Sequence, residues 1–80
     1  MTEAEIEKQV KEILSGRLNI EIKKINSDSK LVDDLGMDSF GAIELMFELE
    51  DKLGIEFPEK DALSLNTVKD LISYIYLRKK

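Results

Sequence analysis

The segment DDLGMDSFGAIELMFELEDKLG, residues 33–54, contains the clearest helical signal in the chain. Asp38 suits the N-cap position, because a short carboxylate can accept a hydrogen bond from the backbone N–H groups of a first helical turn. Apolar residues then recur at helical spacing as far as Gly54, a residue type that readily adopts the left-handed conformation in which helices end. We therefore predict a helix from Ser39 to about Leu53.

The residues on the N-terminal side predict one further helix. Thr2-x-x-Glu5 has the pattern of a capping box, in which each side chain satisfies the backbone N–H of the other residue. We expect this helix to stop at Gly16. Its apolar residues recur at helical spacing and form the expected core stripe: Ile6, Val10, Ile13 and Leu14.

Residues 17–38 form a long connection between these two helices. The stretch NIEIKKI (19–25) alternates like a β-strand, but one short strand would have no partner. We therefore expect an ordered loop that can include a helical turn. Apolar residues of the connection are expected to pack on the helices: Leu18, Ile20, Ile22, Ile25, Leu31 and Val32.

The C-terminal side predicts a short helix followed by a longer one. Pro58 suits the first turn of a short helix over about 59–63, and Thr67-x-x-Asp70 resembles a second capping box. The expected core stripe of the last helix is Val68, Leu71, Ile72 and Ile75. The predicted fold is therefore all-α: a small four-helix bundle with three longer helices, one short helix and a long ordered loop, in a single domain over residues 1–80.

The composition supports a small folded domain and excludes several kinds of protein. Apolar residues make up 42% of the 80 residues, which argues against disorder. No stretch approaches the roughly 18 apolar residues of a membrane span, and residues 1–20 lack the apolar run of a signal peptide. The chain has no cysteine, which excludes disulfides and thiolate chemistry and fits a reducing compartment, so we expect a cytoplasmic location.

The charges are unevenly distributed along the chain. Residues 33–61 contain ten acids and two bases, a net charge of −8, whereas the remaining residues sum to +3. Nucleic acid is an improbable partner, because binding phosphates requires a basic surface. A basic protein surface is the partner that this pattern favours, although acids can also simply keep a small domain in solution.

Ser39 stands out because Asp38 already fills the cap position. A serine needs a base to become a nucleophile, and a chain without histidine cannot form a Ser-His-Asp triad. General acid–base catalysis by Asp33 and Asp34 is also disfavoured, because so small a domain has little room to desolvate these carboxylates and shift their pKa values. A phosphate ester on Ser39 would lie at the positive end of the helix dipole. A serine–lysine pair is formally open. Apart from that, Ser39 is either an ordinary helix-start residue or a site that another enzyme modifies.

The motif LGMDSF (35–40), followed by AIELMFELEDKLGIEFP (42–58), resembles the acyl carrier protein family. The resemblance covers nearly the whole chain, including LVDDLG (31–36) and NTVKDLISYI (66–75). It implies that Ser39 carries 4′-phosphopantetheine, attached by a phosphopantetheinyl transferase, and that the chain is a non-catalytic carrier. It further implies that acyl thioesters on this arm move between acyl-transferring and chain-elongating enzymes of fatty-acid, lipid or polyketide-type biosynthesis.

Two positions depart from the usual pattern of the family. Gly41 stands where carriers of the fatty-acid type usually have an acid, and Phe40 replaces the more common leucine. The pathway and the acyl cargo therefore stay open. The alternatives are a carrier of aminoacyl groups, as in D-alanyl or peptidyl carriers, and a small acidic adaptor without a prosthetic group. We expect a monomer in each case.

The predicted helix over 39–53 carries more apolar residues than one core stripe needs. Its expected core residues are Ala42, Leu45, Met46, Leu49 and Leu53. The surplus either reflects a broadly buried helix or forms an apolar ridge that docks partners beside a row of acids. In the second interpretation the docking residues are Asp38, Phe40, Ile43, Glu44, Phe47, Glu48, Glu50 and Asp51.

The sequence also bears on a shelter for the cargo and on metal binding. A shelter for the acyl cargo, plain core packing, or both at once are expected from Met46, Leu49, Ile55, Ala62, Leu63, Leu65 and Ile72. We expect no metal site, because the spacing of the acids at residues 33–38 does not match a calcium-binding EF-hand loop.

Overall fold

The computed structural model describes residues 2–62 and 64–79, and the side chain of Ser39 falls outside this description. The elements in chain order are α1 (Glu3–Leu18), a 3₁₀ turn η1 (Ile22–Lys24), α2 (Ser39–Leu53), α3 (Glu59–Ala62) and α4 (Val68–Lys79). An isolated antiparallel bridge between Lys30 and Thr67 is the one extended pairing in the described residues. The prediction of an all-α fold is confirmed.

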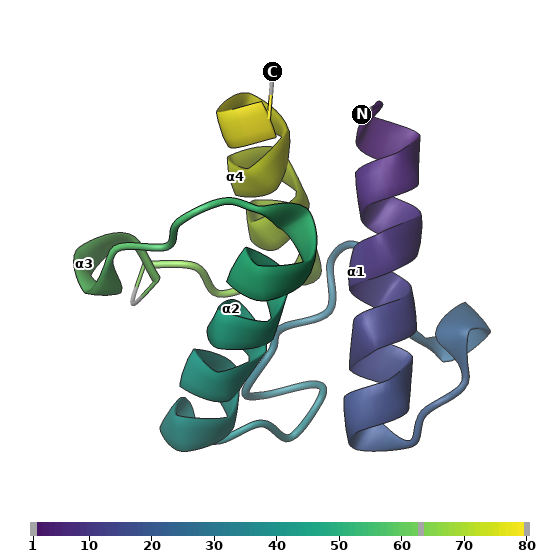
Figure 1. Cartoon of the computed structure of the whole chain (residues 1–80). Helices are drawn as coiled ribbons and strands as arrows, with labels where there is room; N and C mark the ends of the chain where they lie inside the picture. The colour runs from purple at the N-terminus through teal and green to yellow at the C-terminus, as the bar shows by residue number, and fades with distance from the viewer. Residues whose placement is uncertain (1, 63, 80) are drawn as a thin grey trace.

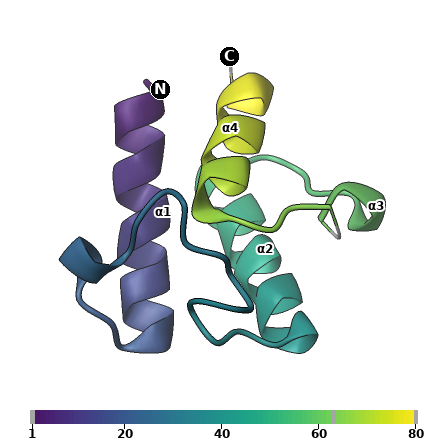
Figure 2. The ribbon, with the colours of Figure 1, turned by 180° about the vertical axis from the view of Figure 1, so that it is seen from behind.

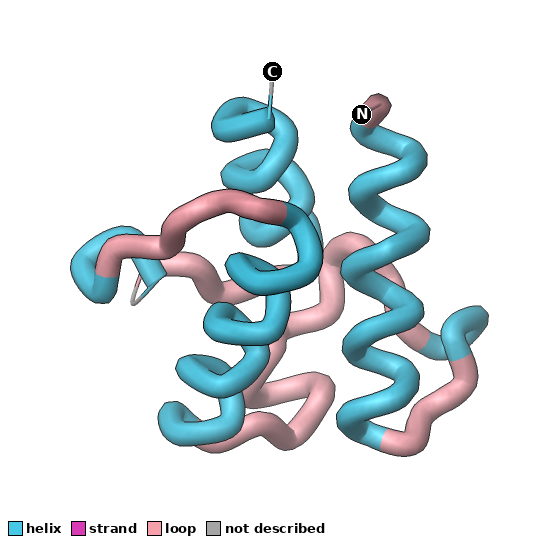
Figure 3. The backbone as a smooth tube through the Cα atoms, viewed as in Figure 1, coloured by secondary structure: helices cyan, strands magenta, loops and turns pink. Residues whose placement is uncertain are grey.

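The three longer helices lie beside one another and the short one lies outside them (Figure 1). α1 runs downward in this view, whereas α2 and α4 run upward, so the described ends of the chain lie at the same end of the bundle. The view from behind shows the connection between α1 and α2 crossing the opposite face of the molecule (Figure 2). Figure 3 shows that this connection is loop apart from the short turn η1.

Reciprocal capping positions the first turns of α1 and α4, as the sequence predicts. At α1, the Thr2 hydroxyl accepts from the Glu5 N–H at 3.2 Å and the Glu5 carboxylate accepts from the Thr2 N–H at 2.9 Å. The bond from the Thr2 backbone lowers the pKa of Glu5, because it stabilises the charged form. At α4, Thr67 and Asp70 form the same pair of bonds, both at 3.1 Å.

The prediction that the first helix stops at Gly16 is wrong. α1 continues to Leu18 and ends at Asn19, whose φ of 56° places it in the left-handed region. Asn19 tolerates this conformation, and the backbone N–H groups of Asn19 and Ile20 both donate to the Ser15 carbonyl. The two extra residues bring Leu18 against the core, a gain in burial that the local glycine signal does not reveal.

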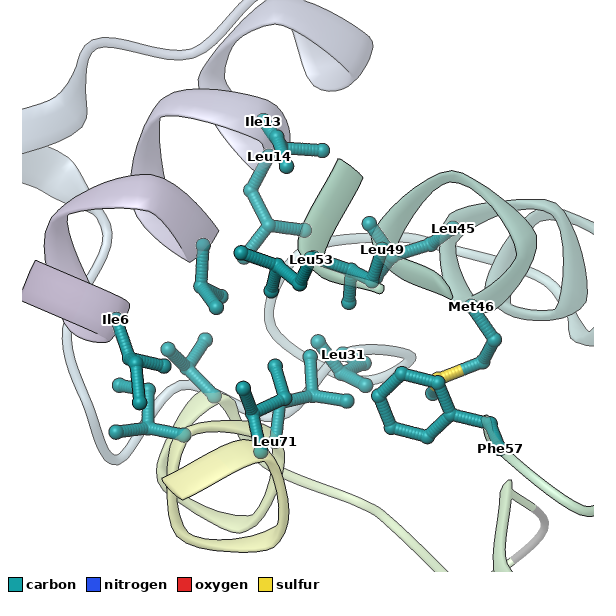
Figure 4. Close-up of a cluster of buried hydrophobic side chains, with 14 of the residues drawn as sticks. Ile6, Ile13, Leu14, Leu31, Leu45, Met46, Leu49, Leu53, Phe57 and Leu71 are labelled. Carbon is teal, nitrogen blue, oxygen red and sulfur yellow. The ribbon is translucent and has the colours of Figure 1, made fainter. Parts of the chain in front are cut away.

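The core lies between α1, α2 and α4 (Figure 4). Side chains from these three helices and from the connection point into a common volume, and Phe57 lies at its edge beside Met46. The predicted stripes of α1 and α4 are all buried. On α2 four of the five predicted core residues are buried, at most 4% exposed, whereas Ala42 is half-buried near the start of the helix.

The long connection is ordered, as predicted, and its contacts with the start of α4 explain why. The Leu31 N–H donates to the Asn66 carbonyl at 2.9 Å, and the Lys69 N–H donates to the Ser27 carbonyl at 2.8 Å. Ile25 and Leu31 are buried in the core. The connection packs on the helices, as expected, but two of its apolar residues stay largely in solvent: Ile22 is 45% exposed and Val32 is 54% exposed.

Side chains of α4 and of the preceding loop hold the short helix α3. The described residues of the predicted helix over 59–63 are Glu59–Ala62, which form α3, and Leu63 lies outside the described residues. The Tyr74 hydroxyl donates to Asp61 at 2.8 Å, and the Tyr74 ring stacks on Phe57 with centroids 5.0 Å apart. Partial burial and this bond raise the pKa of the Tyr74 hydroxyl, because both favour its neutral form.

Candidate functional site

The start of α2 is defined by local backbone geometry around Asp38. Asp38 is extended, with φ −92° and ψ 177°, and its carboxylate accepts from the Gly41 N–H at 2.6 Å. Just before it, the buried side chain of Met37 and the backbone bond from the Met37 N–H to the Leu31 carbonyl anchor the chain. As a result Ser39 is the first residue of α2, at the position that the sequence predicts.

Position 39 lies in an electropositive part of the backbone, between two exposed residues. Its neighbours Asp38 and Phe40 are exposed, and the Phe40 ring retains 70% of its accessible surface. The first N–H groups of a helix have no intrahelical partners, and the helix dipole is positive there. This environment fits a phosphate ester. The chain has no histidine, so a Ser-His-Asp triad cannot form here.

The expected apolar ridge on α2 is exposed to solvent. Phe40, Ile43 and Phe47 are 70%, 37% and 64% exposed, whereas Leu45 and Leu49 of the same helix are fully buried. The interpretation of α2 as a broadly buried helix is therefore wrong. Exposed phenylalanines that follow one another along a helix are the kind of surface on which proteins associate.

The acids predicted to dock partners fall into two groups in the structure. Asp38, Glu44 and Asp51 are exposed, and Asp38 also caps α2. Glu50 is half-buried, and its carboxylate accepts from the Phe57 N–H at 2.7 Å, so it holds the loop that leaves α2. Glu48 forms an ion pair with Arg17 of α1 at 2.7 Å. The sequence analysis did not single out Arg17, because 31 residues separate it from Glu48.

The residues considered for a cargo shelter are core residues. Met46, Leu49, Ile55 and Ile72 are buried, at most 9% exposed, and Ala62 and Leu65 pack against them. Leu63 lies outside the described residues. The alternative of plain core packing describes the arrangement in this structure.

A surface pocket that the sequence analysis missed lies beside the first turn of α2. It has a volume of about 260 Å³, and Val32, Ala42 and Leu65 supply apolar lining. Lys30, Asp33 and Asn66 add polar groups. Its residues come from three separate parts of the chain, so no pattern in the sequence brings them together.

Most of the chain is similar to a family of known proteins. Residues 8–75 match the family model described as phosphopantetheine attachment site. The chain belongs to the acyl carrier protein family. It is 41% identical over 80 residues, all of both chains, to a protein named acyl carrier protein from Chloroherpeton thalassium (strain ATCC 35110 / GB-78).

A solved structure supports the family at the level of the fold. The acyl carrier protein from Enterococcus faecalis, described for its high thermal stability, superimposes with a TM-score of 0.83 at 33% identity. The match covers 98% of this chain and 99% of that one. The cofactor of this family is 4′-phosphopantetheine, and the chain functions as an acyl carrier.

The described residues also bear on metal binding and on membrane insertion. In the parts of the chain that the structure describes, three or more metal-binding side chains nowhere gather into a group able to hold an ion. Among residues 2–62 and 64–79, every helix is too short or too polar to cross a membrane.

Proposed function

We propose that Ser39 is the residue to which the prosthetic group is attached. The observation that carries the proposal is the place of this serine: it is the first residue of α2, directly after the capping residue Asp38. Asp38 holds the helix start through the N–H of Gly41, so this cap does not depend on the Ser39 hydroxyl. The 4′-phosphopantetheine group supplies a thiol that holds acyl groups as thioesters. The chain itself supplies an anchor and a surface, and no catalytic residue.

Intact mass spectrometry tests the attachment site directly. Incubation with coenzyme A and a phosphopantetheinyl transferase is expected to add the mass of one phosphopantetheine to the wild-type chain and none to Ser39→Ala. Ser64→Ala is the matched control, because Ser64 is an exposed serine whose hydroxyl donates only to the Asp61 carbonyl, and it should gain the full mass. A gain of mass by Ser39→Ala would refute the assignment.

We further propose that partners with basic surfaces dock on the outer face of α2. The exposed carboxylates of Glu44 and Asp51 favour their approach, and the ridge of Phe40, Ile43 and Phe47 supplies apolar contact area. The transferase and the acyl-transferring and chain-elongating enzymes are such partners. The acidic outer face favours acyl over aminoacyl cargo, and we place this single monomeric domain in the cytoplasm.

Charge reversal tests the docking surface. Glu44→Lys is expected to slow phosphopantetheine transfer through slower association, and the effect should fade as salt is added. Glu3→Lys is the control, because it makes the same change of charge at an exposed position of α1. It should change the transfer rate less than Glu44→Lys does. Equal transfer rates for Glu44→Lys and wild type at low salt would show that the acids are merely solvated surface.

A further inference from the structure

Arg17 projects from the last turn of α1 onto the outer part of α2. Its Nε–H donates to the Glu48 carboxylate at 2.7 Å, and an Nη2–H donates to the backbone carbonyl of Glu44 at 3.3 Å. Two bonds to residues one helical turn apart fix the guanidinium against the surface of α2. Arg17 therefore lies on the face where, in the proposed function, partners place their own cations.

Lys52 adds a second cation to the same carboxylate. Its ammonium group lies 3.7 Å from the second oxygen of Glu48, so each carboxylate oxygen has a cation of this chain within 4.0 Å. The Arg17 and Glu48 side chains keep only 31% and 28% of their accessible surface. Glu44 and Asp51 are exposed, and neither forms an ion pair with another described residue.

We propose that Arg17 is a specificity-determining residue that masks Glu48 from basic partners. A partner cation that approaches Glu48 must displace Arg17, and it then lies beside the displaced guanidinium, where like charges repel. A partner that approaches the carboxylate of Glu44 displaces no cation, because that carboxylate forms no ion pair with another described residue. The inference rests on the proposed docking function of α2, and it directs transferases and other basic partners away from Glu48 and toward the exposed carboxylates of Glu44 and Asp51.

A purely structural role is the rival explanation. A cation in the last turn of α1 is favourable for the helix dipole, and an ion pair between α1 and α2 can hold the two helices together. That role predicts a change in the stability of the fold when Arg17 is removed. It predicts no salt-dependent gain in the rate of reaction with a basic partner.

The first experiment measures phosphopantetheine transfer from coenzyme A by a transferase, with thermal melting as a check on folding. Arg17→Gln is compared with Lys69→Gln, which removes one positive charge from an exposed position on α4. At low salt Arg17→Gln is expected to raise kcat/KM about twofold or more above the Lys69→Gln control, since contacting groups couple at least this strongly. The increase in kcat/KM should come from a lower KM with kcat unchanged, and it should vanish at high salt.

A double-mutant cycle locates the effect. In a Glu48→Gln background, Arg17→Gln should give no more gain than Lys69→Gln, because no carboxylate remains to be unmasked. An equal response to Arg17→Gln and Lys69→Gln in the wild-type background would overturn the inference. A gain that persists without the Glu48 carboxylate would overturn it as well.

A second comparison leaves Arg17 in place and so avoids any loss of folding in its variants. Glu44→Gln should lower kcat/KM at least about twofold more than Glu48→Gln, because only the first carboxylate is open to partners. Equal losses would contradict masking. A wild-type chain that gains no phosphopantetheine would overturn the proposed function together with this inference, whereas the comparisons above overturn the inference alone.

Discussion

The inner and outer faces of α2 contain the same kinds of residue in opposite environments. Leu45 and Leu49 are fully buried against the other helices, whereas Phe40 and Phe47 are 70% and 64% exposed. The outer residues are the larger and equally apolar, so hydrophobicity alone does not decide burial. Position around the helix does, since only one face of α2 meets the core.

α1 shows what a helix without a second apolar face looks like. Its four predicted core residues are all buried, and the residues between them are mainly charged or polar. The additional apolar stripe of α2 serves no purpose in folding that the structure reveals. This stripe starts at Phe40, next to Ser39. An apolar surface at that place is consistent with the docking of partners proposed above.

The largest effect is expected on the inner face. Leu49→Ala should lower the free energy of unfolding by about 2–5 kcal/mol, because it removes a fully buried side chain and leaves a cavity. Urea denaturation followed by circular dichroism measures this loss. A change below about 1 kcal/mol would mean that the inner face of α2 is not the packed core that its burial indicates.

The start of the helix should respond less strongly. Asp38→Ala removes the carboxylate that accepts from the Gly41 N–H and should lower the free energy of unfolding by about 1 kcal/mol. Asp38→Asn should keep most of this stabilisation, because an amide oxygen can also accept the capping hydrogen bond. Asp51→Ala is the control on the same helix. If Asp38→Ala melts at the same temperature as Asp51→Ala, the cap does not stabilise α2.

Two helical glycines offer a smaller comparison. Gly16 has no neighbour within 4 Å of an added Cβ, so Gly16→Ala should raise stability by about 0.5–1 kcal/mol. A Cβ on Gly41 would lie 3.1 Å from the Asp38 carboxylate oxygen that caps the helix. Gly41→Ala should therefore gain less, because the capping group must shift. A larger gain for Gly41→Ala in thermal melts would show that the cap adapts without loss.

The smallest change in stability is expected on the outer face. Phe47→Ala should alter the free energy of unfolding by no more than about 0.5 kcal/mol, because the ring is 64% exposed. It should nevertheless weaken phosphopantetheine transfer, with little dependence on salt, since the lost contact is apolar. A loss of stability comparable to that of Leu49→Ala would assign Phe47 to the core and restrict docking to the acids.

The sequence predicts the helices better than it predicts the site. Both capping boxes, the start of α2 at Ser39 and its end at Gly54 are confirmed, because caps act within one turn of chain. The predicted end of α1 is wrong, because the helix continues beyond Gly16 to Leu18. Gly16 and Asn19 can both end a helix, and the choice depended on the packing of Leu18.

The exposure of the ridge was open from the sequence and is settled by the structure. A wide apolar arc on a helix fits broad burial as well as a docking surface, because periodicity gives the direction of a side chain and not its neighbours. The same limit applies to the acids. Glu44, Glu48 and Glu50 look alike in the sequence, yet the first is exposed, the second pairs with Arg17 and the third binds the Phe57 N–H.

The sequence by itself thus determined the class of fold, the helix that begins at Ser39 and the resemblance to a family whose membership is confirmed. These properties depend on residues within a few turns of one another. The tertiary structure alone decided which apolar face stays in water and that Arg17 reaches Glu48 across 31 residues. Contacts between distant residues follow from how helices pack, and no local pattern records that arrangement.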